Sequence, residues 1–140
     1  MPRRILLIED SEPDRELLRV ALARLDDPPG LEEAATGEAG LASLQESLDG
    51  ANLPALVLLD INLPGVDGHE VLARIRTRAG IAGVPVVMLS TSSDPTEVRR
   101  CYEAGANAYL VKPASVKRQT QMLADLRSFF FVQAALPYDA

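Results

Sequence analysis

The sequence predicts an α/β protein with an open, doubly wound (βα)5 fold: a five-stranded parallel sheet between two helical layers, forming a three-layer α/β/α sandwich. Three observations carry this prediction. Short apolar runs lack polar alternation, helix-spaced apolar residues lie between them, and the pair of patterns recurs five times in 140 residues. Unalternated apolar runs indicate strands buried on both faces. Their alternation with helices indicates parallel pairing through right-handed crossovers.

Five apolar runs define the predicted strands, and each of them ends at or leads into a charged or hydroxyl side chain. The strongest covers residues 55–60, where apolar residues lead directly into Asp60 and a Pro-Gly turn follows. The weakest covers residues 31–35. In chain order, the predicted strands span residues 5–8, 31–35, 55–60, 84–89 and 106–111.

A segment with apolar residues at helical spacing follows each strand. Ser11 and Thr36 are suited to cap the first two helices, and Ser93 or Asp94 is suited to cap the fourth. Asp14 lies in an acidic first turn, where carboxylates interact favourably with the helix dipole. In chain order, the predicted helices span residues 11–25, 36–48, 68–78, 94–104 and about 115–135.

The composition predicts one domain covering residues 1–140, with the extended helix at its C-terminal end. Apolar residues make up 47% and charged residues 24%, which is ordinary for a soluble domain. The net charge of −6 disfavours binding to nucleic acid or to an anionic membrane surface. No apolar run approaches the roughly 20 residues of a membrane span. A single cysteine, Cys101, cannot form an internal disulfide, and we therefore expect a cytoplasmic protein.

Chemically active side chains collect where the predicted strands end. Because all strands of a parallel sheet end at the same edge, these side chains should lie together. They are Glu9, Asp10, Asp60, Ser90 and Lys112. Clustered carboxylates repel one another unless a cation lies among them, and hard oxygen ligands suit Mg²⁺. A carboxylate held between Mg²⁺ and Lys112 could attack a phosphoryl donor and form an acyl phosphate.

Each of these residues also has a simpler explanation when taken alone. Glu9 or Asp10 could cap the helix that follows, and Asp60 could form a turn. Ser90 could act as a cap as well, and Lys112 could be a solvated loop residue. Four independent strand ends with complementary chemistry favour a shared site over coincidence.

Four stretches of the sequence resemble the receiver domain of bacterial two-component response regulators. They are Ile8-Glu9-Asp10, residues 58–68 around Asp60, Met88-Leu89-Ser90, and residues 105–113, which end in Lys112-Pro113. The resemblance covers about residues 3–128. It implies the flavodoxin-like receiver fold and a phosphoprotein that serves in phosphorelay signal transduction.

The resemblance also implies a role for each acid of the cluster. Asp60 would accept a phosphoryl group from the phosphohistidine of a sensor histidine kinase. Asp10 and Asp60 would bind Mg²⁺ directly, and Glu9 would bind it through a water molecule. Asn62 would contribute its backbone carbonyl to the metal, and its side chain occupies a position that tunes how water reaches the acyl phosphate.

Three further residues would carry the response to phosphorylation. Lys112 would contact the phosphoryl oxygens, Ser90 would swing inward to bond them, and Tyr109 would change rotamer to fill the vacated space. One new hydrogen bond supplies only ~1–3 kcal/mol, so the switch must be a small bias on a two-state element. Thr91 departs from the family, in which Ala or Gly is more usual, and could narrow the approach to Asp60.

The last helix carries more apolar surface than one face can bury. A core-facing stripe at helical spacing comprises Val116, Leu123, Leu126 and Phe130, whereas Met122, Phe129, Phe131 and Val132 fall partly off it. The surplus either packs against the sheet or meets a partner. We expect a homodimer through the helix at 94–104, the strand at 106–111 and the last helix. The Phe129–Phe131 extension resembles receivers paired with bacterial phytochromes, which implies a bacteriophytochrome as the kinase.

Three functions compete at this point. The leading interpretation is a stand-alone response regulator that switches protein–protein interactions or relays phosphate, rather than an enzyme. The second is a Mg²⁺-dependent aspartyl-phosphate phosphohydrolase, but such enzymes commonly need a second acid two residues after the nucleophile, where this chain has Asn62. The third is a degenerate receiver that acts as a scaffold, and the intact acids and Lys112 count against it.

Overall fold

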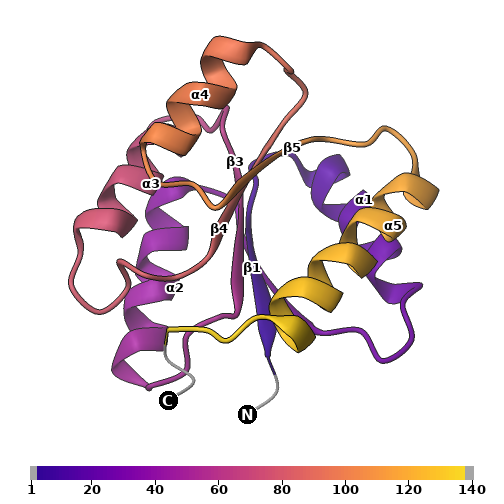
Figure 1. Cartoon of the computed structure of the whole chain (residues 1–140), viewed down its shortest axis with the longest axis horizontal. Coiled ribbons are helices and arrows are strands. Elements are labelled where there is room, and N and C mark those ends of the chain that lie inside the picture. The colour runs from indigo at the N-terminus through magenta and orange to yellow at the C-terminus, as the bar shows by residue number, and fades with distance from the viewer. Residues whose placement is uncertain (1–2, 138–140) are drawn as a thin grey trace.

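The computed structural model describes residues 3–137, and in this part of the chain it confirms the predicted α/β/α sandwich (Figure 1). The strands are β1 (Arg4–Ile8), β2 (Gly30–Ala34), β3 (Leu56–Asp60), β4 (Val86–Ser90) and β5 (Ala108–Val111). The α-helices are α1 (Glu12–Ala23), α2 (Gly37–Asp49), α3 (Gly68–Thr77), α4 (Pro95–Glu103) and α5 (Val116–Arg127).

The five strands are parallel and lie in the order β2-β1-β3-β4-β5. The chain therefore builds outward from β1 to one edge of the sheet and then crosses back to continue from β3 to the other edge. The reversal of strand order lies between β1 and β3, and open α/β sheets bind ligands outside the carboxyl ends of the strands at such a point.

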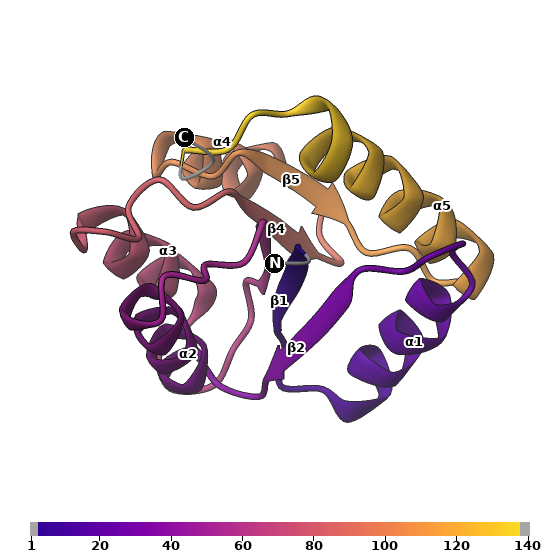
Figure 2. The same cartoon turned by 90° about the horizontal axis from the view of Figure 1, so that it is seen from below.

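Helices cover both faces of the sheet, with α1 and α5 on one face and α2, α3 and α4 on the other (Figures 1 and 2). The side chains of β1 show why its sequence lacks polar alternation. Ile5 and Leu7 pack into the core beneath α1 and α5, whereas Leu6 and Ile8 pack into the core on the opposite face. Burial of each such side chain contributes about 1.5–3 kcal/mol relative to leaving it exposed.

The predicted helix caps are present. Ser11 accepts a hydrogen bond from the Asp14 amide at the start of α1, and Thr36 accepts one from the Ala39 amide at the start of α2. At α4 the cap is Asp94, which accepts from the Thr96 amide. These side chains satisfy amides that a helix leaves unpaired at its first turn.

The last helix changes its character where the phenylalanines begin. The α-helix α5 ends at Arg127 and continues as a π-helical segment, Ser128–Gln133, so helical structure ends two residues before the expected end at about 135. Phe130 is buried in the core, as the apolar stripe predicted, whereas Phe129 is 58% exposed. Their rings meet edge to face, 4.9 Å apart between centroids. Within residues 3–137, no helix is both long and apolar enough to span a membrane.

Candidate functional site

Four strand ends bring most of the predicted site residues to one edge of the sheet. Asp60 is the last residue of β3 and Ser90 the last of β4, and both are buried. Backbone hydrogen bonds extend the sheet past the other two strands: the Glu9 amide donates to the Ala34 carbonyl, and the Lys112 amide donates to the Ser90 carbonyl at 2.7 Å. The sheet itself therefore fixes where these four side chains begin.

Three carboxylates form the acidic part of the site. One oxygen from each of Glu9, Asp10 and Asp60 lies within 4.8 Å of the others. Glu9 and Asp60 are buried and Asp10 is exposed, so the cluster is open to solvent on one side. Asn62 is also exposed and lines the same surface hollow as Asp10. An open set of hard oxygen ligands is suited to a divalent cation that keeps some of its water.

The loop after β3 returns tightly to the strand end. The Gly68 amide donates to the Ile61 carbonyl at 2.9 Å, and Asp67 caps α3 by accepting from the Glu70 amide. A Cβ atom at residue 68 would lie only 2.4 Å from the Asp60 carbonyl oxygen. Glycine is therefore required there, because the helix begins in direct contact with the backbone of Asp60.

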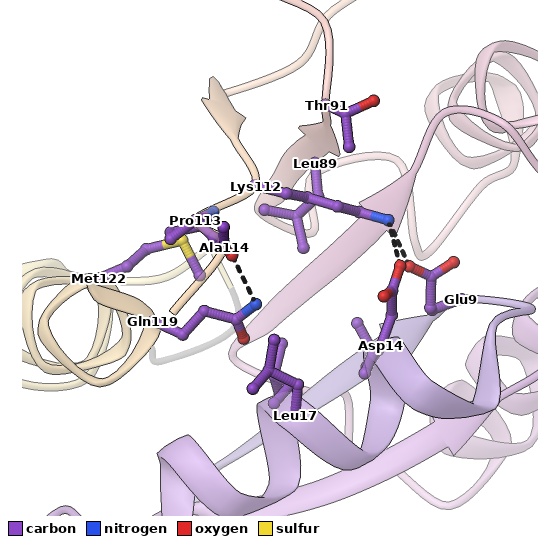
Figure 3. A pocket seen from close by; sticks show the side chains of 12 residues that line it. Glu9, Asp14, Leu17, Leu89, Thr91, Lys112, Pro113, Ala114, Gln119 and Met122 are labelled. Carbon is purple, nitrogen blue, oxygen red and sulfur yellow. Dashed lines mark hydrogen bonds and ion pairs between the residues drawn. The ribbon is translucent and has the colours of Figure 1, made fainter. Parts of the chain in front are cut away.

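Lys112 supplies the positive charge of the site and is shared among three acids. Its Nζ lies 2.5 Å from Glu9 Oε1, 3.1 Å from Asp14 Oδ2 and 3.4 Å from Asp60 Oδ1. Figure 3 shows the lysine side chain pointing toward Asp14 and Glu9 from the opposite side of a pocket. Asp14 was expected only as a first-turn acid of the helix, and the structure adds it to the surroundings of Lys112.

Burial and the neighbouring charges shift the pKa values of Glu9 and Lys112. Burial raises the pKa of Glu9 to about 8, and the hydrogen bond and charge of Asp60 add to the shift, while Lys112 partly offsets it. Burial alone would lower the pKa of Lys112, but its hydrogen bond to Glu9 and the charges of Asp60 and Glu9 outweigh burial and raise it. One ammonium group does not balance the surrounding carboxylates, so the site favours a further proton or cation.

Ser90, Tyr109 and Ser92 are linked by hydrogen bonds beside the acids. The Ser90 hydroxyl accepts a hydrogen bond from the Ser92 amide at 3.1 Å, and the Tyr109 hydroxyl donates to the Ser92 carbonyl at 2.7 Å. Tyr109 also packs against the core on the α2–α4 face of the sheet. Residue 92 thus connects the serine at the end of β4 to the aromatic ring on β5.

Thr91 is exposed and lines the pocket in which Lys112 lies. A hydroxyl-bearing side chain therefore borders the pocket beside Lys112, at a position where the resemblance leads one to expect a smaller residue.

The fold and the site define a response regulator receiver. Residues 5–124 match the profile of the response regulator receiver domain, and the chain belongs to that family. Response regulator Rcp1 of Synechocystis is 37% identical over 138 residues, covering 97% of this chain and 94% of Rcp1. The chain is thus a two-component response regulator receiver related to Rcp1 and to phytochrome response regulators.

Solved structures give the same relationship. The phosphorylated cyanobacterial phytochrome response regulator RcpA superposes with a TM-score of 0.86 at 33% identity, covering 98% of this chain and 99% of RcpA. The Mn²⁺-bound form of Rcp1 superposes with a TM-score of 0.82 at 36% identity, covering 97% of this chain and 99% of Rcp1. The bacteriophytochrome response regulator RtBRR superposes with a TM-score of 0.76 at 37% identity, covering 99% of this chain and 86% of RtBRR.

The structure places the predicted side chains at one edge of the sheet and adds two nearby side chains that were not predicted from the sequence. Asp14 contacts Lys112, and buried Gln119 lines the adjoining pocket. A signal for Asp14 was available, because the first turn of the helix after β1 must lie near the edge where Lys112 ends β5. No local signal marks Gln119, which occupies a helix with several other polar residues.

Proposed function

We propose that this chain is a stand-alone response regulator whose Asp60 accepts a phosphoryl group from the phosphohistidine of a sensor histidine kinase. The observation that carries the proposal is the placement of Asp60, a buried carboxylate with Lys112 at 3.4 Å and two further acids around it. An Asp60 oxygen forms the new P–O bond as the P–N bond breaks, and the electron pair stays on the imidazole nitrogen of the kinase.

The chain's own residues divide the work of this transfer. Asp10, Asp60 and the Asn62 backbone carbonyl would hold Mg²⁺, with Glu9 acting through water. The raised pKa of Glu9 supports this assignment, because the acidic cluster lacks positive charge without a cation. When bound, Mg²⁺ offsets the negative charge on the phosphoryl oxygens. Lys112 approaches the same oxygens from the other side and must loosen its contacts with Glu9 and Asp14 to do so.

Ser90 and Tyr109 carry the response. Ser90 turns its hydroxyl from the Ser92 amide to a phosphoryl oxygen, which removes one bond that holds residue 92. The Tyr109 hydroxyl donates a hydrogen bond to the carbonyl of the same residue. When residue 92 shifts, that hydrogen bond weakens, and the Tyr109 ring is free to change rotamer. The exchange of one hydrogen bond supplies ~1–3 kcal/mol, which is enough to shift a nearly balanced two-state equilibrium.

The output is a change in protein–protein contacts, with a bacteriophytochrome as the kinase and a homodimer as the working form in the cytoplasm. Relatedness to phytochrome response regulators supports the choice of kinase. Large apolar side chains are exposed at Tyr102 on α4, Val111 on β5 and Phe129 after α5. They support the expected dimer face. A monomer by sedimentation at high micromolar concentration, with and without phosphorylation, would rule the dimer out.

Stoichiometry distinguishes this function from the phosphohydrolase. The protein is incubated with acetyl phosphate and Mg²⁺, and both bound and released phosphate are measured. A receiver takes up one acid-stable, base-labile phosphoryl group per chain and leaves phosphate esters such as p-nitrophenyl phosphate unchanged. Steady turnover of the ester would favour the enzyme, and the absence of any labelling would favour a scaffold.

A further inference from the structure

A cavity of about 230 Å³ lies beside the phosphoacceptor site, between α1 on one side and the β5–α5 connection and α5 on the other (Figure 3). Its wall is mostly apolar. The apolar side chains that line it include Leu7, Leu17, Leu18, Leu89, Pro113 and Met122. Charged groups are confined to one side, where Glu9, Asp14 and Lys112 pair with one another.

Two buried polar atoms on this wall lack a hydrogen-bond partner among the described residues: Glu9 Oε2 on the charged side, and Gln119 Oε1 on the opposite side. Gln119 is 7% exposed, and its Nε2 donates to the Pro113 carbonyl at 3.1 Å, which fixes the orientation of the amide. The other amide atom, Oε1, is buried without a hydrogen bond among the described residues. Figure 3 shows it turned away from Pro113 and toward Leu17. A buried acceptor left unpaired is costly, so the apolar part of the wall carries one uncharged acceptor, Gln119 Oε1, that lacks a donor.

The volume and the charges limit what this space can hold. An apolar cavity of about 150 Å³ accommodates benzene, so by proportion one of this volume holds about nine non-hydrogen atoms. The carboxylates of Glu9 and Asp14 disfavour an anion near the rim. A cation is disfavoured in the interior as well, because the wall away from Glu9, Asp14 and Lys112 is apolar and burying a charge there is costly.

We propose that this cavity is a binding site for a small, uncharged, ring-shaped molecule that donates one hydrogen bond to Gln119 Oε1. A bicyclic ring with an N–H group, such as indole, has this size and chemistry. The site stands apart from the proposed phosphoryl transfer, since none of its ligand contacts requires Asp60 to be phosphorylated. We therefore expect binding in the Asp60→Asn variant as well, which keeps this proposal distinguishable from the proposed function.

The test compares indole with benzofuran, which has a similar shape but no N–H donor. The sequence contains no tryptophan, so indole fluorescence can be followed without tryptophan background. Amide chemical shifts give the location of binding for both molecules. We expect indole to bind with a dissociation constant of ~0.1–1 mM and about fivefold or more tightly than benzofuran. The shifted amides should lie around Leu7, Leu17 and Gln119.

Three variants separate the acceptor from the cavity. Gln119→Leu should bind indole and benzofuran about equally, because the acceptor is lost; the hydrogen bond to the Pro113 carbonyl is lost too, but that loss affects both molecules alike. Gln121→Leu is the matched control, since Gln121 is exposed on the same helix and bonds Asp125, and it should keep the preference for indole. Leu17→Phe should weaken the binding of both indole and benzofuran, because the larger side chain narrows the cavity. Equal affinity for the two molecules in the unmodified protein, or shifts centred elsewhere, would overturn the proposal and leave a cavity that holds only water.

Discussion

Metal binding at the acidic cluster should depend steeply on pH, because protonation of Glu9 removes a negative charge that favours the metal ion in the cluster. Burial, reinforced by the Asp60 carboxyl, raises the pKa of Glu9 to about 8. With that value the carboxyl is about 1% ionised at pH 6 and about half ionised at pH 8. If the metal requires the ionised form, the Mg²⁺ association constant rises about fifty-fold over this range, equivalent to about 2.3 kcal/mol.

Isothermal titration calorimetry with Mg²⁺ at pH 6, 7 and 8 measures this directly. Two buffers with different ionisation enthalpies count the proton that Glu9 releases on binding. Glu9→Gln is uncharged at every pH and should lose the steep dependence. Glu16→Gln, which removes an exposed acid from α1, should retain it. A change of less than about threefold between pH 6 and pH 8, or a steep dependence that survives in Glu9→Gln, would refute the reasoning.

Three further outcomes follow from the same contacts. Without metal, folded Glu9 keeps a proton that the unfolded chain loses near its usual pKa of 4.5, so the free energy of unfolding should fall as pH rises from about 5 to 8, and Mg²⁺ should reduce that fall in urea titrations. Asp14→Asn should release Lys112 and speed labelling by acetyl phosphate up to about fivefold, whereas Glu16→Gln should not. Gly68→Ala should cost about 1–3 kcal/mol by thermal unfolding, because its Cβ would strike the Asp60 carbonyl. If the pH dependence, the labelling rate or the thermal stability stayed unchanged, the role given to the corresponding contact would be wrong.

The sequence was sufficient to predict the architecture and the edge at which the chemistry gathers. Apolar runs such as residues 55–60 are local signals, and the rule that parallel strands end at one edge turns separate positions into neighbours. That rule places Glu9, Asp60 and Lys112 together from their positions in the sequence alone. It works because the sheet, rather than a flexible loop, fixes the starting point of each side chain.

Contacts between helices and loops were harder to predict from the sequence. Asp14 meets Lys112 across 98 residues, and that contact depends on how α1 packs beside the β5–α5 connection. The same packing buries Gln119, although its surroundings in the sequence are polar. At the end of the last helix, residue spacing correctly separated buried Phe130 from exposed Phe129, but an α-helical period cannot anticipate the wider π-helical turns there.

The most direct test of the central claim is to map the phosphoryl group after labelling with acetyl phosphate and Mg²⁺. Borohydride reduction of the acyl phosphate converts the modified aspartate to homoserine, which peptide mass spectrometry can place in the sequence. We predict a single modified residue, Asp60, and no labelling of Asp60→Asn. Modification at another residue, or undiminished labelling of Asp60→Asn, would contradict the account.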